Sequence, residues 1–203
     1  ILRCLVGSEM CIRDRYNESH RHFSHALAIH PLGLIDWSNG EKDQQIILAT
    51  LKKMKDYGPD YWTGYTYAWY ANMLARAFKG EEAAEALRVF ASCFCLKNLF
   101  HANGDQSGTG KSLFTYRPFT LEGNFAFAAA VQEMLLQSHT GVVRVFPAIP
   151  EEWKDVAFTD LRARGGFLVS AERKGGKVVQ VKIVSEKGGT LHFLSPDTGE
   201  VLE

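Results

Sequence analysis

A single carboxylate stands at the start of the most apolar stretch of this chain. Glu122 lies in the turn LEGN, and the seven residues from Phe125 to Val131 are all apolar. This stretch predicts a helix that is apolar nearly all round, and such helices are normally buried on most sides. We therefore expect a carboxylate at the mouth of a deeply packed helix. Packing would fix its position for work as a catalytic acid or base.

Four histidines fall within eleven residues near the start of the chain: His20, His22, His25 and His30. Imidazole is a common metal ligand, but this stretch has no HExxH spacing and no accompanying carboxylate or cysteine pattern. A hydrogen-bonding cluster of Arg21, His22 and His25 in a polar pocket is favoured over a metal site. The alternative is that these histidines lie in a packed part of the structure, where their hydrogen bonds are satisfied and they have no functional role.

Aromatic residues crowd the stretch YWTGYTYAWYANMLARAF (residues 61–78). Trp62, Tyr65, Trp69 and Met73 recur at three to four residues, which marks one face of a helix. The aromatic core of a helical bundle explains most of them. Trp62 and Tyr65, near the start, are the two that are also candidates to line a sugar site.

The letters GTGKS, residues 108–112, invite a nucleotide-binding reading. A phosphate-binding loop requires a glycine five residues before Gly110, and that position is Asp105. Such a loop also follows a strand, whereas a helix is predicted here. The pattern therefore indicates an ordinary polar loop.

The surrounding elements change type along the chain. Residues 41–57 predict an amphipathic helix that ends at Gly58-Pro59. A second helix follows with the aromatic stretch, Lys79-Gly80 caps it, and a third runs from Glu81 to about Phe100. Together with the Glu122 helix these are four of the five helices that the pattern predicts. Several strands follow, which means two domains in series.

Four short runs rich in Val, Ile and Phe predict the strands: VVRVFPAIP, GGFLVSAER, KVVQVKIVSE and GTLHFLSP. The sequences KGGK and KGG separate the last three and are strong hairpin signals. In the third run Val179, Val181 and Ile183 alternate with polar residues, so one face of that strand should be exposed to solvent. The tail from about Val142 is interpreted as an antiparallel β layer.

Composition excludes several functions. Lys+Arg and Asp+Glu both total 23, so no excess charge points to nucleic acid or to an anionic membrane surface. No apolar run approaches the ~20 residues that span a bilayer. Residues 1–15 fit no element and look like a non-native leader, so we set them aside. Of the remaining cysteines, Cys93 and Cys95 are two apart on a predicted helix and cannot pair with each other.

Six blocks of sequence, in order, resemble the C-terminal part of glycoside hydrolase family 95: HRHFSH, GYTYAWYANMLARAFKGEEA, NLF, FTLEGNFAFAAAVQEMLLQSHTG, FPAIPEEW and LRARGGFLV. That family contains α-L-fucosidases and some L-galactosidases. The resemblance covers residues 17–179 and implies a mainly α fold followed by β. Residues 16–140 would be the closing helices of an (α/α)6 barrel and residues 141–203 an antiparallel β-sandwich.

The resemblance also implies roles for particular residues. Glu122 is the counterpart of the family's general base, and Arg21 and His22 fall where its Arg-His pair contacts the sugar. The family usually has Asp where Glu122 stands and Gln where Thr120 stands, so the base here is longer by one methylene. Asn124 is a candidate sugar contact, although a helix cap or support of the turn is the favoured role.

The same resemblance implies an inverting enzyme that needs no metal or other cofactor. Its substrate would be an oligo- or polysaccharide ending in α-L-fucose or a related sugar, and its location extracellular or periplasmic in a bacterium. The cell compartment cannot be read from the residues themselves.

Inverting hydrolysis needs two carboxyl groups roughly 6.5–9.5 Å apart. Glu133 follows Glu122 by eleven residues, about 16 Å along a helix at ~1.5 Å per residue, which is too far. We expect Glu133 and Gln137 to be structural hydrogen-bonding residues, the general acid to lie upstream, and this chain alone to be inactive. The alternatives are a non-catalytic carbohydrate-binding or scaffold protein on the same fold, or another six-hairpin glycosidase or phosphorylase. A carboxylate at position 122 argues against a phosphate there.

Overall fold

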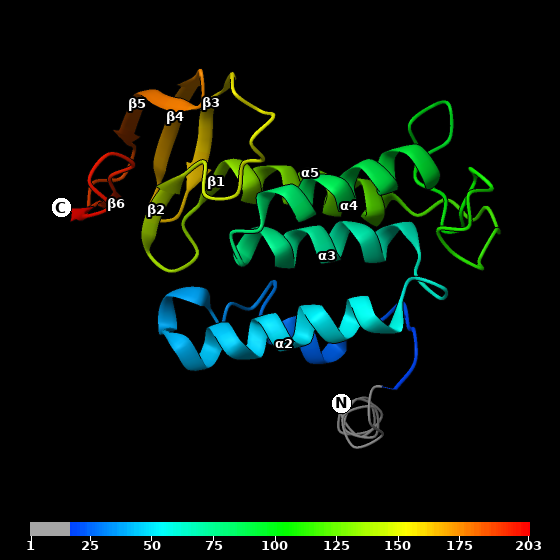
Figure 1. Ribbon diagram of the computed structural model, residues 1–203. Helices are drawn as coiled ribbons and strands as arrows, with labels where there is room; N and C mark the ends of the chain where they lie inside the picture. The colour runs from blue at the N-terminus through cyan, green and yellow to red at the C-terminus, as the bar shows by residue number, and fades with distance from the viewer. Residues whose placement is uncertain (1–16) are drawn as a thin grey trace.

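The computed structural model describes residues 17–203, so the proposed leader at residues 1–15 lies outside the described part. Its helical part holds four α-helices and two short 3-10 helices, against the five helices expected (Figure 1). These elements are η1 (Ser24–Ala28), η2 (Trp37–Asn39), α2 (Glu41–Tyr57), α3 (Gly64–Arg76), α4 (Gly80–Cys93) and α5 (Leu121–Leu135). Two β-sheets follow, so the chain is helical first and β second.

Helix α2 begins and ends where the sequence predicts. Glu41 and Asp43 place negative charge in its first turn, where the helix dipole favours it. Gly58 ends the helix with a φ of 73°, a left-handed conformation that glycine adopts without strain. Ile47 and Met54 are fully buried on one face, so this amphipathic helix packs through a single stripe.

Helix α3 is the centre of the helical core. Every residue of it except Tyr65 is buried. Thr63 and Thr66 form a reciprocal capping box at its start, which satisfies backbone N–H groups of the first turn. The helix packs against both α4 and α5. Because it is covered on nearly all sides, α3 fixes the positions of the residues at its two ends.

The expectation that the Glu122 helix is buried on most sides is wrong. In α5 only Gly123, Ala130 and Met134 are buried, and Phe125 is 65% exposed. Within residues 17–203, α5 is covered by α3 on one face and by α4 to a smaller extent, so its other apolar residues reach the surface. The central helix of this structure is α3, and Glu122 must be held by something other than deep packing.

The junction between α3 and α4 also differs from the expected glycine cap. Phe78, and not Gly80, takes the left-handed conformation, with a φ of 57°. Gly80 begins α4, and a Cβ at this position would lie 2.7 Å from the carbonyl of Ala148. The glycine is therefore required for close packing against the β part. Helix α4 ends at Cys93, seven residues before the predicted Phe100.

The β part contains two sheets. The first is antiparallel, in the order β3 (Val156–Ala163), β4 (Phe167–Lys174) and β5 (Lys177–Ser185). The second has the order β1 (Leu136–Gln137), β2 (Val142–Val145), β6 (His192–Leu194) and β7 (Val201–Leu202). Strands β2 and β6 run parallel, so the tail is mixed and not wholly antiparallel. Val143 from one sheet and Val169 from the other belong to the same buried cluster.

One of the two predicted hairpins is confirmed, since Gly175 and Gly176 of KGGK join β4 to β5 with positive φ angles. Three other details of the strands depart from the sequence pattern. The KGG at 187–189 is not a hairpin, because the chain there crosses to β6 of the other sheet. A bulge shifts the β4–β5 register next to Val178, which leaves Val179 54% exposed instead of on the inner face. Strand β3 was not predicted.

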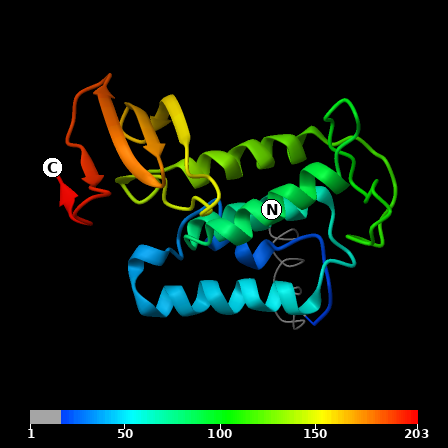
Figure 2. The ribbon, with the colours of Figure 1, turned by 45° about the horizontal axis from the view of Figure 1, so that its top comes forward.

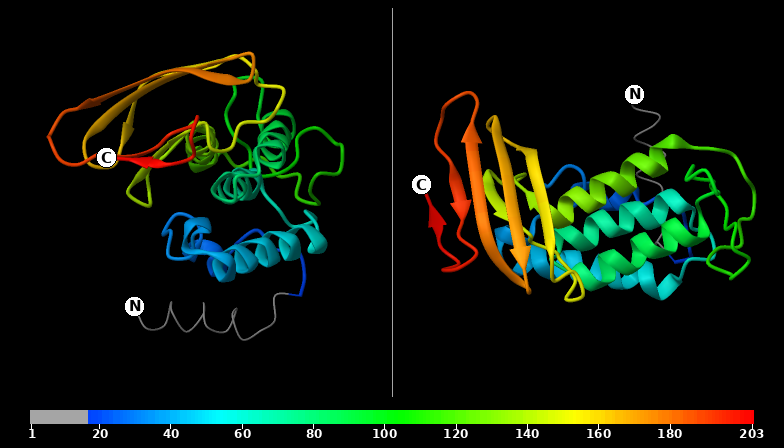
Figure 3. Two further views of the ribbon diagram at one scale, coloured as in Figure 1. Left: turned by 60° about the vertical axis from the view of Figure 1, so that its left-hand side comes forward. Right: turned by 90° about the horizontal axis from the view of Figure 1, so that it is seen from above.

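The two ends of the helices have different neighbours. Figures 1 and 3 show the sheets at one end of α3, α4 and α5, and the long loop that connects α4 to α5 at the other. Figure 2 shows α2 on the opposite side of α3 from α5. No helix in residues 17–203 is long and apolar enough to cross a membrane. The N-termini of α3 and α5 both lie at the loop end, and this is where the predicted site residues meet.

Candidate active site

A cavity of about 340 Å³ opens at the loop end of the helices. It brings together four of the residues singled out from the sequence and three that were not. They are Arg21, His22, Tyr65 and Glu122 from the first group, and Thr63, Asn103 and Tyr116 from the second. Four separate segments supply this lining, so the arrangement depends on the tertiary fold. Its volume lies within the range of small-molecule pockets.

Glu122 is the only carboxylate among the described residues that line this cavity. It lies in the first turn of α5, where the positive end of the helix dipole favours a negative charge. Its side chain is exposed. Arg21 brings a guanidinium to the same cavity and places it over the ring of Phe114, 5.8 Å from the ring centre. The site therefore holds one negative and one positive group.

The neighbouring rings respond to this charge and to burial. Burial, and then the charge of Glu122, raises the pKa of the Tyr65 hydroxyl, so that group stays protonated at neutral pH. Partial burial, followed by the charges of Arg21 and His20, lowers the pKa of His22. A neutral imidazole can both donate and accept a hydrogen bond. The cavity thus offers donors and acceptors suited to hydroxyl groups.

A buried histidine that the sequence did not single out lies beneath the cavity. His101 is fully buried and stacks on Phe90 with ring centres 5.1 Å apart. Its ring lies between the starts of α3 and α5, against Gly64 and Gly123. A Cβ on either glycine would lie 2.3 Å from a ring nitrogen. The glycine of the LEGN turn is therefore needed so that α5 can approach His101.

A short chain of hydrogen bonds links this histidine to the cavity. The Nδ1 of His101 lies 2.8 Å from both the carbonyl and the hydroxyl oxygen of Thr120. The Thr120 hydroxyl donates to Oδ1 of Asn103 at 3.1 Å. Because the carbonyl oxygen of Asn103 is engaged, its amide nitrogen is the donor that this residue offers to the cavity. Burial lowers the pKa of His101, although the bond to Thr120 and the charge of Glu122 oppose this.

Two residues proposed from the sequence lie elsewhere. Trp62 is buried in the core, edge-on to the rings of Phe23 and Tyr67, and lines a separate apolar cavity beside α2 and α4. Asn124 accepts a hydrogen bond from the backbone N–H of His101 and donates to the carbonyl of Leu99. The oxygen and the nitrogen of its side-chain amide are both hydrogen-bonded to the segment from Leu99 to His101. Asn124 therefore supports the local backbone, which is the kind of role that the sequence analysis favoured over contact with a sugar.

The GTGKS loop folds around a carboxylate of its own. Asp105 accepts hydrogen bonds from the backbone N–H groups of Ser107 and Lys111, at 2.7 and 2.9 Å, and from the Ser107 hydroxyl. Burial opposes ionisation, but these bonds lower the pKa of Asp105. The loop N–H groups that a phosphate would need are turned toward this side chain, and the loop follows α4 instead of a strand.

The histidine-rich stretch does not gather into one cluster. His20 and His22 are neighbours with ring centres 5.5 Å apart, whereas His25 packs against Phe23. His30 is partly buried and lies within the electrostatic influence of Arg76. Within residues 17–203, no group of three His, Cys, Asp or Glu side chains is placed to hold a metal ion.

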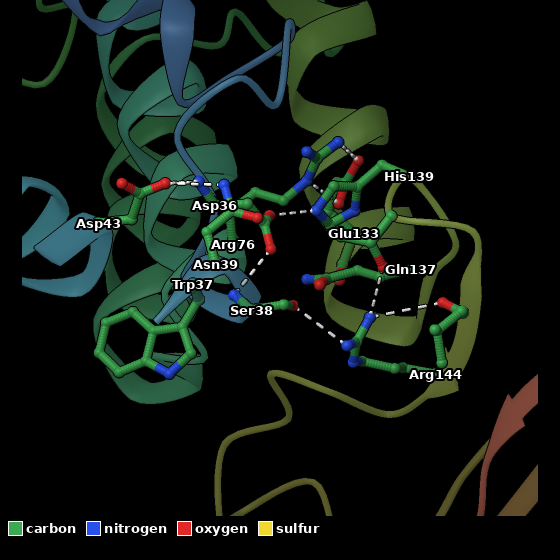
Figure 4. A network of polar contacts seen from close by, with 12 residues as sticks. Asp36, Trp37, Ser38, Asn39, Asp43, Arg76, Glu133, Gln137, His139 and Arg144 are labelled. Atoms are coloured by element: carbon green, nitrogen blue, oxygen red, sulfur yellow. Dashed lines mark hydrogen bonds and ion pairs between the residues drawn. The ribbon is translucent and has the colours of Figure 1, made fainter. Parts of the chain in front are cut away.

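The opposite end of α3 carries a second set of polar residues, drawn in Figure 4. Arg76, 6% exposed, forms a two-point ion pair with Glu133 at 2.6 and 2.8 Å. Gln137 donates to the carbonyls of Ala75 and Glu133. Glu133 and Gln137 therefore form structural hydrogen bonds, as expected. This network ties α3 to α5 and to the start of the β part.

His139 extends this network toward η2. Its Nε2 lies 2.6 Å from a carboxylate oxygen of Asp36, and the backbone N–H of Ser38 donates to the other oxygen. Burial alone would raise the pKa of Asp36, but these hydrogen bonds lower it well below its usual range. The ionised carboxylate is thus stabilised at all but strongly acidic pH.

We expect the free energy of unfolding to fall as the pH drops from 6.5 toward 4. Burial first, then the positive charges of Arg76 and His139, lowers the pKa of His30 to about 4, and the Glu133 charge only partly opposes this. The unfolded chain therefore binds more protons in this window. At ~1.4 kcal/mol per pH unit the loss reaches about 2–3 kcal/mol.

Urea unfolding of wild type and His30→Asn at several pH values checks this expectation. The variant should show a flatter profile between pH 6.5 and 4 than the wild type. The same substitution at His192, which is partly exposed on β6, serves as the control. Parallel profiles for wild type and His30→Asn would contradict the assignment.

Comparison with known families agrees with the order of a helical part followed by a β part. Residues 11–135 match the glycosyl hydrolase family 95 catalytic domain, and residues 137–202 match the glycoside hydrolase family 95 C-terminal domain. The chain therefore belongs to glycoside hydrolase family 95, as its sequence blocks indicated. The first match begins at residue 11 and so overlaps the last residues of the segment set aside above.

A named relative supports the same assignment. The chain is 34% identical over 170 residues to alpha-L-fucosidase 2 of Arabidopsis thaliana. This alignment covers 83% of the chain but only 19% of the relative. The chain thus spans about a fifth of the length of the curated protein that it matches.

Proposed function

We propose that this chain is the C-terminal part of an inverting exo-glycosidase that removes α-L-fucose or a closely related sugar from a glycan. The observation that carries the proposal is the cavity in which Glu122, Arg21 and His22 come together, in a chain of family 95. The fucosidase named above is the basis for the choice of sugar. In the intact enzyme α2–α5 would belong to an (α/α)6 barrel, and the two sheets would form a β-sandwich.

Glu122 is proposed as the general base. In inverting hydrolysis a water attacks the anomeric carbon while a carboxylate takes one of its protons and the bond to the leaving oxygen breaks. Glu122 is exposed to the cavity, so it can reach such a water. Gly123 and His101 fix the turn that carries it.

The other residues of the cavity suit the binding of a sugar. Arg21 donates hydrogen bonds from a planar guanidinium, and a neutral His22 can donate and accept. The ring of Tyr65 and the amide of Asn103 lie in the same lining. We propose that these four side chains hold sugar hydroxyls and orient the water. Trp62 and Asn124 would act on the site only through the fold.

A second carboxyl group is needed to protonate the leaving oxygen. No other carboxylate of residues 17–203 lines the cavity, and Glu133 is engaged by Arg76. The general acid would come from a part of a longer polypeptide, of which this chain covers the C-terminal portion. The 203-residue chain by itself should therefore lack glycosidase activity.

The experiment is turnover of an aryl α-L-fucoside and of an aryl α-L-galactoside by the longer polypeptide, with the anomer of the released sugar followed by NMR. We expect the fucoside to be hydrolysed faster and the first product to be the β-anomer. Release of the α-anomer would rule out the inverting mechanism. Faster turnover of the galactoside would change the sugar and keep the mechanism.

The second candidate function is a carbohydrate-binding protein without catalysis. The presence of Glu where family 95 usually has Asp favours it, because a longer side chain takes space that the attacking water needs. Binding of L-fucose without turnover of either glycoside, by the same longer polypeptide, would select this function.

A further inference from the structure

A second cavity, of about 490 Å³, lies at the end of the helices opposite Glu122. Parts of η2, α2, β2 and the turn after α3 form its wall, together with the loop that follows β6. Its ten described lining residues include two aromatic rings, Trp37 and Phe78, and one charged group, Arg144. Nothing in the proposed glycosidase mechanism uses this cavity. It is large enough for a pyranose ring.

Arg144 is a half-buried cation without a carboxylate partner. Its Nη1 donates to the Thr140 hydroxyl and the Val142 carbonyl, and its Nη2 donates to the Ser38 hydroxyl (Figure 4). None of the ion pairs among residues 17–203 includes it. Burial lowers the pKa of the guanidinium, and the charge of Asp36 only partly compensates. These bonds use three of the five N–H donors of an arginine.

The acidic group whose charge acts on Arg144 is already committed. The carboxylate of Asp36 is hydrogen-bonded to His139 and to the backbone of Ser38. The cavity wall therefore contributes a positive charge and no negative one. An anionic group entering this cavity would meet free donors on a guanidinium, whose planar fork matches a carboxylate or a sulfate.

One of the two rings of the cavity is carried by a strained backbone. Phe78 adopts a φ of 57°, and such a conformation in a bulky residue costs of the order of 1–3 kcal/mol. Its ring meets Trp37 edge-on, with centres 6.1 Å apart, and remains 37% exposed at the cavity. Backbone strain of this kind is concentrated at ligand-binding positions. An aromatic face beside a polar group is suited to the apolar face of a sugar ring.

We propose that this cavity is a second glycan-binding site, which takes an acidic pyranose carrying a carboxylate or a sulfate. The anionic group would bind Arg144, and the sugar ring would lie against Trp37 and Phe78. The site is separated from the Glu122 cavity by about the length of α3, ~20 Å at 1.5 Å per residue. The choice of a sugar as ligand rests on the proposed function, while the site itself does not depend on Glu122.

Titration calorimetry on the 203-residue chain tests the proposal with three matched probes. They are an oligogalacturonate, the same oligomer with its carboxylates reduced to alcohols, and a sulfated oligosaccharide of equal length. We expect the reduced oligomer to bind at least about tenfold more weakly than the acid, as loss of a charge-assisted hydrogen bond implies. The acid and the sulfated probe distinguish the two kinds of anion.

Variants assign the binding to this cavity. Arg144→Gln should weaken binding of the acidic probe by about tenfold or more, and Arg144→Lys by less, because it keeps the charge but not the fork. Trp37→Leu should weaken the acidic and the reduced oligomer alike. Arg162→Gln removes an exposed arginine of β3 that pairs with Glu186, and it should leave binding unchanged.

Three results would overturn the proposal. They are equal binding of the acid and the reduced oligomer, equal effects of Arg144→Gln and Arg162→Gln, and loss of acid binding in Glu122→Gln. Thermal melting shows whether each variant folds, and Arg144→Lys carries the test if Arg144→Gln does not. A negative binding result at this cavity would not change the outcome expected in the fucoside assay. The acidic-glycan site and the proposed glycosidase function can therefore be disproved independently.

Discussion

Glu122→Gln is expected to lower the kcat of the longer enzyme on an aryl α-L-fucoside by about a thousandfold, within the 10²–10⁴ range of general acid–base catalysis. The amide has nearly the shape of the carboxylate but cannot take a proton from water. An aryl leaving group departs with little help, so the measured loss reports on the base and not on the acid. Because Glu122 is exposed, only its interaction with the α5 dipole is lost, and the melting temperature should fall by no more than about 2–4 °C.

The companion variant is Glu122→Asp, which restores the residue that family 95 usually carries. If the glutamate is a working base, moving its carboxylate back by one methylene should reduce turnover. Activity that appears only in Glu122→Asp would show a site that has decayed in this branch of the family. Equal turnover by wild type and Glu122→Gln would place the base elsewhere and end the proposed role.

Gly123→Ala is expected to destabilise the fold by about 3 kcal/mol, at the upper end of the usual cost of overpacking. Inside a helix, alanine would normally stabilise by up to about 1 kcal/mol relative to glycine. Here the added Cβ would lie 2.3 Å from Nδ1 of His101, a ring that is fully buried and stacked on Phe90. The clash outweighs the gain in helix propensity, because the His101 ring is enclosed between Phe90 and Gly64 and cannot shift without losing its hydrogen bond to Thr120.

Chemical denaturation of the 203-residue chain measures this effect, and two variants calibrate it. Ala128→Gly, on the exposed face of α5, reports the helix propensity alone. The double variant His101→Ala with Gly123→Ala should be more stable than the sum of the single variants predicts, because the clash is then absent. Strict additivity would show that His101 and Gly123 do not oppose each other. In the longer enzyme, Gly123→Ala should also reduce turnover by shifting Glu122.

The family and the order of helices and strands were readable from the sequence, because they rest on local patterns and ordered blocks of residues. Helix α2 ends at Gly58 since a left-handed glycine followed by proline stops a helix in any context. The KGGK hairpin forms for a similar local reason. The choice of Arg21, His22, Tyr65 and Glu122 came from motif and spacing, and these four residues do share one cavity.

Burial and strand pairing were decided by contacts between distant segments. The apolar composition of α5 could not show that α3 would take the central position and leave Phe125 at the surface. The parallel pairing of β2 with β6 joins segments about fifty residues apart, and the bulge that exposes Val179 depends on β4. Period-two alternation describes one strand and says nothing about its partner's register.

The residues that position the site could not be found along the sequence either. His101 lies in a polar loop without any pattern, yet its ring separates the starts of α3 and α5 and requires a glycine on each. Phe78 takes a positive φ that the sequence pattern assigned to Gly80, whereas Gly80 makes the close contact with Ala148. The sequence determined which polar side chains this protein offers for chemistry, Glu122 and its neighbours among them. The tertiary structure decided what holds that chemistry in place, because close contacts between segments distant in the chain leave no local signal.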